Sequence, residues 1–184
     1  EGIYGVKFLL YDEDRNPIGE FTSDDDGYVY ITADDLPDGA NTSGRFYLRE
    51  LEAAEGYILD KEYKTVYVRP GRTAEIEWVN EAITGQIQIY KYAAEANSVT
   101  GVPAGTPLQG AVYEIINERS GRVVDYITTD ARGVAASKPL PLTRYKIREV
   151  TAPAYFQLDP TVHDVTLEYA GQIIKIAAYD SRPI

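Results

Sequence analysis

The 184-residue sequence has no cysteine and no methionine, and His163 is its single histidine. The absence of cysteine excludes disulfide bonds, thiolate nucleophiles and cysteine-ligated zinc. With one histidine and no cysteine, the chain also lacks the parts of the usual hydrolase triads and of histidine-rich metal sites. We therefore expect no metal ion, no cofactor and no enzymatic turnover.

Positive charge is also scarce, because 18 lysines and arginines stand against 29 aspartates and glutamates, for a net charge of −11. Nucleic acids and anionic membranes attract basic surfaces, so neither is expected as a partner. No apolar run is long enough to span a membrane, and no signal peptide is present. Because the sequence begins with Glu1 rather than methionine, we interpret it as a mature or excised piece of a longer protein.

Short strands and turns dominate the sequence pattern. Apolar and polar residues alternate in residues 5–11, 27–31, 45–51 and 73–80, and Asn-Pro, Asp-Gly and Pro-Gly pairs supply the turns. The 16 tyrosines suit β-sheet surfaces. Many short strands at close spacing predict an all-β protein of the β-sandwich type.

Both halves of the sequence contain the same motifs in the same order, which indicates an internal repeat. We therefore predict two tandem β-sandwich domains, over residues 1–82 and 83–184. The second copy begins with an extra strand, Gln86–Tyr92, so the first copy is N-terminally incomplete and lacks its first strand within this chain. The aligned segments are Gly5–Tyr11 with Gly110–Ile116, Ser23–Gly27 with Thr129–Gly133, Leu36–Pro37 with Leu140–Pro141, Tyr47–Leu51 with Lys146–Val150, and Ile76–Asn80 with Ile176–Asp180.

Charged side chains fall on the apolar side of three strands in the second copy. Side chains in a strand alternate between faces with period two, so Lys91, Glu149 and Asp180 each share a face with apolar neighbours. In the first copy, Glu50 and Asn80 hold matching positions. Buried charges are costly unless they are paired or neutralised. The alternative is that each charged group lies at a strand end and reaches solvent.

Such a group of side chains has a definite chemistry if it is buried. An apolar site favours the neutral, nucleophilic form of a lysine. A buried glutamate shifts toward its protonated form and can carry protons to a carbonyl and a leaving group. An aspartate or asparagine offers that carbonyl, and proximity supplies much of the rate. Held in contact, the lysine and the aspartate or asparagine can therefore condense to an amide.

The motifs of both copies resemble those of collagen-adhesin B-type domains (Cna protein B-type), which have a prealbumin-like, inverse-immunoglobulin sandwich. The resemblance covers nearly the whole chain. It rests on Pro107–Tyr113, Thr129–Gly133, Leu140–Pro141 and Ile147–Pro153 in the second copy, and on Gly5–Phe8, Asp26–Gly27, Leu36–Pro37 and Leu48–Tyr57 in the first.

The family is known for intramolecular lysine–asparagine or lysine–aspartate isopeptide bonds assisted by a buried glutamate. By position, Lys91 resembles the reactive lysine, Glu149 the assisting glutamate, and Asp180 the partner in its aspartate variant. The resemblance therefore implies a crosslink between Lys91 and Asp180 in the second copy, with Glu149 as the proton shuttle.

In the first copy, Glu50 and Asn80 match the family pattern, but the strand that carries the lysine is absent. Lys7 is no substitute, because it faces away from Val6 and Phe8. We therefore predict no crosslink within the first copy of this chain. The missing strand was either cut off or is supplied by another segment through strand addition.

The resemblance implies a structural stalk, adhesin or pilin fragment of a Gram-positive surface protein, outside the cell and anchored to the cell wall. Its partners would be neighbouring domains of the same surface protein, with a host matrix protein or glycan as a further candidate. The crosslink forms once per chain, so the chain is not expected to be an enzyme. Two alternatives stay open: a carbohydrate- or matrix-protein-binding β-sandwich module, and a regulatory β-domain appended to an enzyme.

Overall fold

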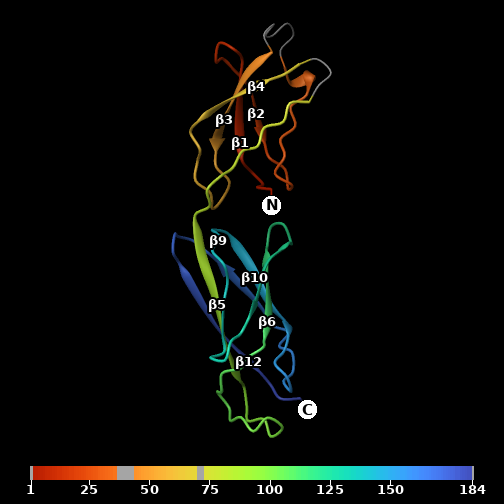
Figure 1. Cartoon of the computed structure of the whole chain (residues 1–184), viewed down its shortest axis with the longest axis vertical. Coiled ribbons are helices and arrows are strands. Elements are labelled where there is room, and N and C mark those ends of the chain that lie inside the picture. Colours follow the sequence, from red (N-terminus) through yellow and green to blue (C-terminus); the bar gives the residue numbers. More distant parts are fainter. Residues whose placement is uncertain (1, 37–43, 70–72, 184) are drawn as a thin grey trace. The chain divides into compact units, whose positions relative to one another are not determined.

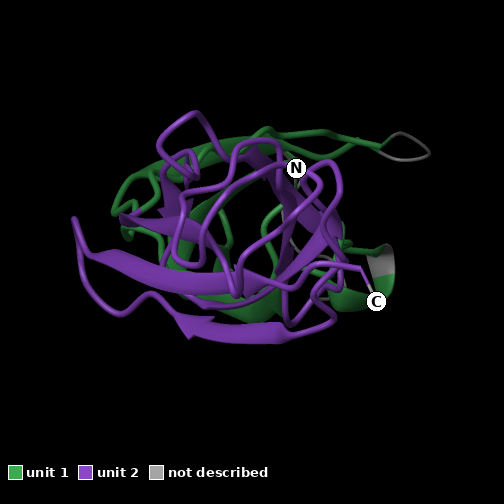
Figure 2. Ribbon diagram, turned by 90° about the horizontal axis from the view of Figure 1, so that it is seen from below, with its two compact units in different colours: residues 1–82 green, residues 83–184 purple. Residues whose placement is uncertain are grey.

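The computed structural model describes residues 2–36, 44–69 and 73–183, which form β-strands and a short 3-10 turn, η1 (Ala33–Asp35). Two compact units divide the chain, Glu1–Ala82 (unit 1) and Ile83–Ile184 (unit 2) (Figure 2). The predicted all-β class is confirmed. Pro37, from the Leu36–Pro37 motif, lies outside the described residues. No helix in the described parts of the chain has the length and hydrophobicity needed to cross a membrane.

Unit 1 contains one four-stranded antiparallel sheet with the strand order β2-β1-β3-β4. Val6, Phe8 and Ala54 form its buried apolar cluster, and the half-buried Trp78 packs against them. The Phe8 and Trp78 rings meet edge to face, with centroids 5.1 Å apart. The strands are β1 (Lys7–Tyr11), β2 (Pro17–Thr22), β3 (Arg45–Glu52) and β4 (Tyr63–Tyr67).

Unit 2 contains two sheets, with the strand orders β11-β10-β6-β7 and β12-β5-β8, and β9 pairs with β5. Alternate residues of each sheet face a common apolar core that includes Ile87, Ile89, Ile115 and Ile147. The strands are β5 (Thr84–Ala93), β6 (Val112–Asn117), β7 (Val123–Thr128), β8 (Val134–Ala136), β9 (Leu140–Pro141), β10 (Arg144–Thr151), β11 (Val162–Thr166) and β12 (Ile173–Asp180).

Strands β5 and β12 lie side by side and run parallel, although they come from opposite ends of unit 2 (Figure 1). Their register places Lys91 opposite Ala178 and Ala93 opposite Asp180. Because side chains two residues apart share a face of the sheet, Lys91 and Asp180 are diagonal neighbours on the core side. The first and last strands of the unit thus bring these two side chains together.

The repeat is visible in matched hydrogen bonds just before β1 in unit 1 and just before β6 in unit 2. The Val6 amide donates to Ser23 Oγ at 2.9 Å in unit 1, and the Ala111 amide donates to Thr129 Oγ1 at 3.0 Å in unit 2. Both hydroxyl side chains are buried. The aligned motifs therefore form the same local structure in the two units.

Two stretches that the alternation pattern predicts as strands, residues 27–31 and 73–80, are not strands in unit 1, and this prediction was wrong. Their counterparts in unit 2, β8 and β12, pair with the two edges of β5. The described part of unit 1 has no strand in the place of β5. An extended segment becomes a β-strand only when a neighbouring strand pairs with its backbone. Both segments lack the inter-strand hydrogen bonds of a sheet for this reason.

The core of unit 2 supports a first prediction. Truncating Ile147, which is fully buried at the sheet interface, to alanine should lower the free energy of unfolding of unit 2 by about 2–5 kcal/mol. Trp78 is the single tryptophan of the chain and lies in unit 1, so its fluorescence would report the unfolding of the wrong unit. The measurement is therefore peptide-resolved hydrogen exchange of β5, β6 and β10 in urea. The control is Val162→Ala, which removes an exposed side chain on β11. Equal effects of the two substitutions would contradict the assigned core.

Candidate functional site

Unit 2 contains a buried lysine between two buried carboxyl groups. Lys91 Nζ lies 2.5 Å from Asp180 Oδ1 and 2.6 Å from Glu149 Oε2. Lys91 and Asp180 are fully buried, and Glu149 is 4% exposed. The alternative in which each charged group reaches solvent at a strand end is therefore wrong. The three residues predicted from the face pattern meet at one point in the interior.

Three strands position this group, one side chain from each. Lys91 projects from β5 in line with Ile87 and Ile89, which are equally buried. Glu149 projects from β10 in the facing sheet, and Asp180 is the last residue of β12. The strict alternation of each strand, rather than a loop, thus aims the three polar groups at one another.

A fourth member of the site, Tyr113, was missed by the sequence reasoning. It lies on β6 directly opposite Glu149, and its hydroxyl accepts a hydrogen bond from Lys91 Nζ at 2.7 Å. Burial, reinforced by the charges of Glu149 and Asp180, raises the pKa of Tyr113 above its usual value, so the hydroxyl keeps its proton. The sequence did contain a signal for Tyr113, because it is a hydroxyl-bearing residue two positions from Ile115 and therefore faces the core.

The electrostatics of the site favour an uncharged acid at Asp180. Burial is the largest influence and raises the pKa of Asp180 from an ordinary 3.8 to about 7, against the lowering effect of Lys91. The Glu149 carboxylate also raises this pKa. A neutral carboxyl group is a far better acceptor for an amine than a carboxylate, because the negative charge on the carboxylate oxygens repels the nucleophile and makes the carbon less electrophilic. The site therefore holds a nucleophile, an electrophile and a second carboxyl group in contact.

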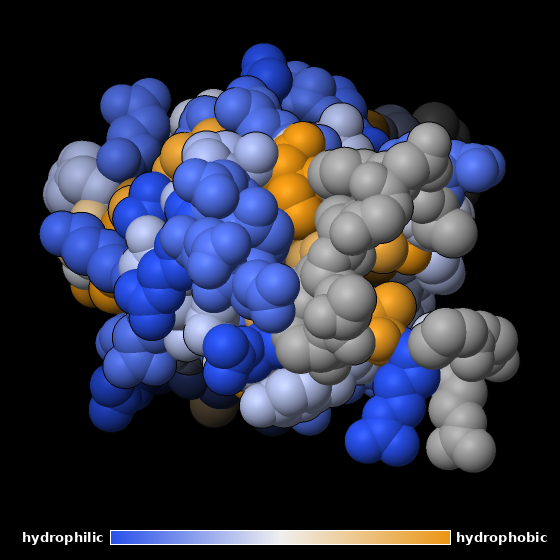
Figure 3. Space-filling view, turned by 90° about the horizontal axis from the view of Figure 1, so that it is seen from above, coloured by the Kyte–Doolittle hydropathy of each residue, from blue (hydrophilic) through white to orange (hydrophobic). Residues whose placement is uncertain are grey.

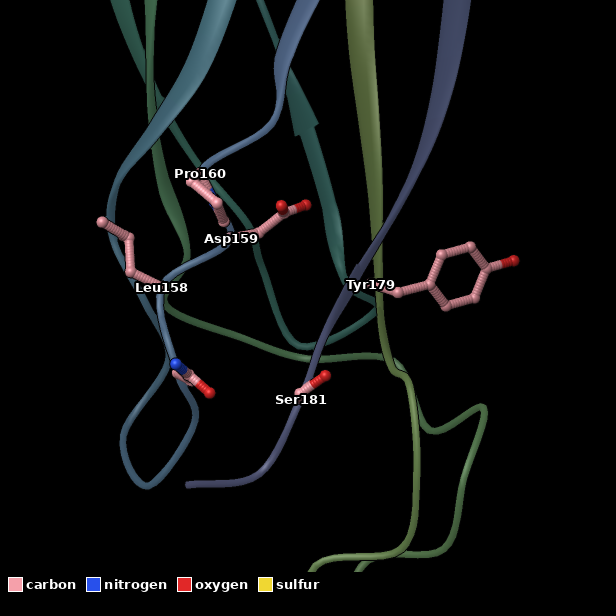
Figure 4. Close-up of a pocket in the computed structure, with 6 residues that line it drawn as sticks. Leu158, Asp159, Pro160, Tyr179 and Ser181 are labelled. Atoms are coloured by element: carbon pink, nitrogen blue, oxygen red, sulfur yellow. The ribbon is translucent and has the colours of Figure 1, made fainter. Parts of the chain in front are cut away.

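The chain segment after β10 covers one end of the site. The Asp159 amide donates to Glu149 Oε1 at 3.1 Å, and the Gln157 amide donates to the Ser181 carbonyl at 2.8 Å. Figure 4 shows the Asp159 side chain directed toward β12, whereas the Tyr179 ring points away from this segment. A pocket of about 200 Å³ is lined by Gln157, Leu158, Asp159, Pro160, Tyr179 and Ser181. Lys91 and Asp180 are fully buried and are not part of this lining.

Unit 1 contains the matching pair without a cation. Asn80 Nδ2 donates to Glu50 Oε2 at 2.7 Å, and the Asp60 amide donates to the same oxygen at 3.2 Å. No lysine forms an ion pair with Glu50 among the residues that the structure describes. Lys7 instead pairs with Glu52 at 3.3 Å on the exposed side of β1, as its position in the alternation pattern indicates.

Together, the fold and the site define two all-β units, the second of which is a sandwich of two sheets with a buried lysine–carboxyl centre. The family model described as the SpaA prealbumin-like fold domain matches the chain twice, over residues 1–82 and 86–182. The chain therefore belongs to this family, and the predicted prealbumin-like fold is confirmed.

Several known proteins are similar to this chain. The trypsin-resistant surface T6 protein of Streptococcus pyogenes serotype M6 is 29% identical over 90 residues, which are 49% of this chain and 16% of that protein. The Bacillus anthracis TIE protein is 28% identical with a TM-score of 0.47, over 99% of this chain and 31% of the other. GBS52, the minor pilin of Streptococcus agalactiae, is 16% identical with a TM-score of 0.48. That match covers 100% of this chain and 85% of GBS52. This chain thus spans less than a third of the T6 and TIE proteins.

The raised pKa of Asp180 supports a prediction about pH. In a Lys91→Met variant, the folded state should hold the Asp180 proton more tightly than the unfolded state does, because burial still raises this pKa. The resulting stability is fully present below the ordinary pKa of 3.8 and is lost as pH rises toward the folded pKa, which is higher in this variant because the lowering effect of Lys91 is gone. Unit 2 of this variant should therefore unfold at lower urea concentration at pH 8 than at pH 5.

The size of this difference should be on the order of a few kcal/mol, since one pKa unit corresponds to about 1.4 kcal/mol. The measurement is hydrogen exchange of β5 and β10 across urea at both pH values. Adding Asp180→Asn removes the titrating group and should shrink the difference. An unchanged difference in the double variant would show that another group is responsible.

Proposed function

We propose that the chain is a structural segment of a bacterial surface protein or pilus, whose unit 2 is closed by an amide bond between Lys91 and Asp180. The observation that carries this proposal is the contact of Lys91 Nζ with both carboxyl groups in a site without solvent. A buried ion pair on its own gives little net stability, since desolvation offsets the attraction. Conversion to a neutral amide removes both ionisable groups of this pair from the interior.

The proposed reaction balances within the site. Neutral Lys91 Nζ attacks Cγ of the protonated Asp180 carboxyl group, a C–N bond forms, and one carboxyl oxygen leaves as water. Glu149 accepts a proton from the attacking nitrogen and returns it to the leaving oxygen. The Tyr113 hydroxyl, held against Nζ, orients the amine. Each chain reacts once, so the chain is its own substrate and is not an enzyme in the turnover sense.

The bond would stabilise unit 2 by joining its first strand to its last. Closing a loop of roughly 90 residues lowers the entropy of the unfolded chain and contributes about 4–5 kcal/mol in the loop-entropy description. β5 and β12 could then not separate without breaking a covalent bond. A protein without cysteine would thereby gain the kind of crosslink that disulfides give to other secreted proteins.

The surface role is supported by the family and by the names of similar proteins, which include a streptococcal surface protein and a minor pilin. We place the chain outside the cell, as part of a longer protein attached to the cell wall. Its partners would be neighbouring domains of that protein or neighbouring pilin subunits. The carbohydrate- or matrix-binding alternative stays a prediction without a specific observation in its favour.

The crosslink has a direct test by mass. The denatured chain should be lighter than its sequence mass by one water, and Lys91→Ala and Glu149→Ala should each restore the sequence mass. Lys175→Ala is the matched control, because this lysine is exposed on the same strand as Asp180 and should leave the deficit in place. Denatured intact-mass spectrometry gives the result.

The mass test must also show where the water was lost, because Glu1 can lose one water by cyclising onto the terminal amine. After proteolysis, tandem mass spectrometry should find one branched peptide that joins Lys91 to Asp180. A wild-type chain of unmodified mass, or a digest in which no peptide joins Lys91 to Asp180, would overturn the proposed bond.

A further inference from the structure

The face of the unit 1 sheet that points away from the apolar cluster carries arginines stacked on tyrosines. The Arg15 guanidinium carbon lies 4.9 Å from the Tyr47 ring centroid and 4.8 Å from that of Tyr63. The Arg49 guanidinium carbon lies 5.1 Å from the Tyr63 centroid and 5.8 Å from that of Tyr11. Both cations therefore share the Tyr63 ring. We call this surface the Arg–Tyr face: Tyr11 on β1, Arg15 in the turn between β1 and β2, Tyr47 and Arg49 on β3, and Tyr63 on β4.

Contacts within the Arg–Tyr face hold its side chains in place. Arg49 Nη1 donates a hydrogen bond to the Tyr63 hydroxyl at 3.2 Å. The Tyr11 and Tyr63 rings pack with their centroids 5.4 Å apart. Tyr11 is 6% exposed although it points away from the apolar cluster, because Arg49 and Tyr63 pack on it. The face is therefore a packed layer rather than a set of independent surface side chains.

The turn between β1 and β2 places Arg15 on this face at a cost in backbone energy. Arg15 has a φ of 63°, a left-handed conformation that is unfavourable for residues other than glycine. Asp12 Oδ1 closes the turn by accepting hydrogen bonds from the Asp14 amide at 2.9 Å and the Asn16 amide at 2.8 Å. The nearest carboxylate at the start of the turn is thus used on the backbone, and the Arg15 guanidinium stacks on the tyrosines instead.

The matching arginine of unit 2 shows what the Arg–Tyr face lacks. Arg148, which is aligned with Arg49, lies directly opposite Glu114 on β6 and forms an ion pair with it. Arg49 lies directly opposite Leu9 on β1, which is aligned with Glu114. Among the residues that the structure describes, neither Arg15 nor Arg49 forms an ion pair with a carboxylate. In this part of the chain, two neighbouring cations therefore have no counter-charge.

This arginine pair is a local exception in a strongly acidic unit. Residues 1–82 contain eight lysines and arginines against 19 aspartates and glutamates, for a net charge of −11, whereas residues 83–184 contain ten of each. Figure 3, which looks onto unit 1, shows hydrophilic residues over much of the surface. The field of such a unit repels a polyanion. The arginine pair therefore suits a partner that brings a few carboxylates to this face and is not strongly acidic as a whole.

The chemistry of the face indicates a polypeptide with carboxylate side chains. A guanidinium that is stacked on rings keeps the N–H groups at its edge available, and their fork matches the two oxygens of a carboxylate. Side chains that are already held in place lose little entropy on binding. Arginine and tyrosine contribute much of the binding energy at protein interfaces. A sheet face is also broad, whereas small molecules bind in concave sites.

We propose that the Arg–Tyr face of unit 1 binds an acidic segment of another protein, with one carboxylate of the partner on Arg15 and a second on Arg49. The Tyr63 ring, which both arginines contact, would lie between the two carboxylates and pack against the residue that separates them. A second copy of this chain is not the partner, because two units with a net charge of −11 repel each other. The proposal does not depend on the Lys91–Asp180 bond, which lies in unit 2.

A peptide selection supplies the test. A phage-displayed library of random short peptides is selected on the full 184-residue chain. The selected peptides should be enriched in aspartate and glutamate relative to the unselected library, with two acidic residues close together. Synthetic, fluorescently labelled copies are then titrated with the chain, and binding is measured by fluorescence anisotropy. Their affinity should fall as the sodium chloride concentration rises, because salt screens the contacts between exposed charges.

Substitutions locate the binding site. Arg15→Gln and Arg49→Gln should each weaken binding by about tenfold or more, since each removes a hydrogen-bonded ion pair with the peptide. Arg49→Lys should also weaken it, because an ammonium group cannot give the two parallel hydrogen bonds of a guanidinium. Arg132→Gln is the matched control, because it removes one exposed positive charge from unit 2 and should leave binding unchanged.

Hydrogen exchange of β1 and β3 shows whether each variant keeps the sheet of unit 1. If Arg49→Gln loosens the sheet, Arg15→Gln decides, because Arg15 is exposed in a turn outside the strands.

Several outcomes would overturn the proposal. Selection that enriches no peptide, or peptides without acidic residues, would contradict the stated partner, and acidic peptides that bind Arg15→Gln as tightly as the wild-type chain would contradict the site. On a glycan array, binding to a sialylated or sulfated glycan that Arg49→Gln abolishes would assign the face to a glycan instead. A dimer seen by sedimentation that Arg49→Gln dissociates would assign it to a second copy.

Discussion

A lysine ammonium can remain in a dry interior only when carboxyl and hydroxyl oxygens replace the water it has lost. In unit 2 those oxygens come from Glu149, Asp180 and Tyr113, each on a different strand. Four strands from two sheets are therefore fixed relative to one nitrogen atom. The apolar core around Ile87 and Ile147 excludes the water that would otherwise weaken these contacts, so core packing and polar geometry depend on each other.

The same constraint takes a milder form in unit 1. There Glu50 faces a neutral amide, and aromatic rings stand where unit 2 has smaller or polar groups, with Phe8 at the place of Tyr113 and Trp78 at the place of Ala178. A single carboxyl group with two amide donors can be held without a buried cation. The described part of unit 1 thus has one four-stranded sheet and no strand in the place of β5.

Much of the candidate site follows from the sequence, because period two assigns a face wherever a segment is paired as a strand. Gln86–Tyr92 meets this condition, and Lys91 lies on the face that the pattern predicts. Residues 73–80 have the same kind of pattern but no neighbour, which local alternation cannot reveal. Tyr113 was missed because a tyrosine fits an apolar stripe through its ring as well as through its hydroxyl. The contact between Lys91 and Asp180 depends on a register between distant strands.

The parallel pairing of β5 and β12 also determines how unit 2 responds to tension. The chain comes into the unit at the start of β5 and leaves it after the end of β12, and these points lie at opposite ends of one strand pair. Pulling on the flanking chain would slide the strands past each other, so the eight paired positions from Ile173–Gln86 to Asp180–Ala93 share the load. An antiparallel pair with both flanks at one end would instead peel apart one hydrogen bond at a time. The topology thus gives unit 2 a shear geometry that is independent of any covalent bond.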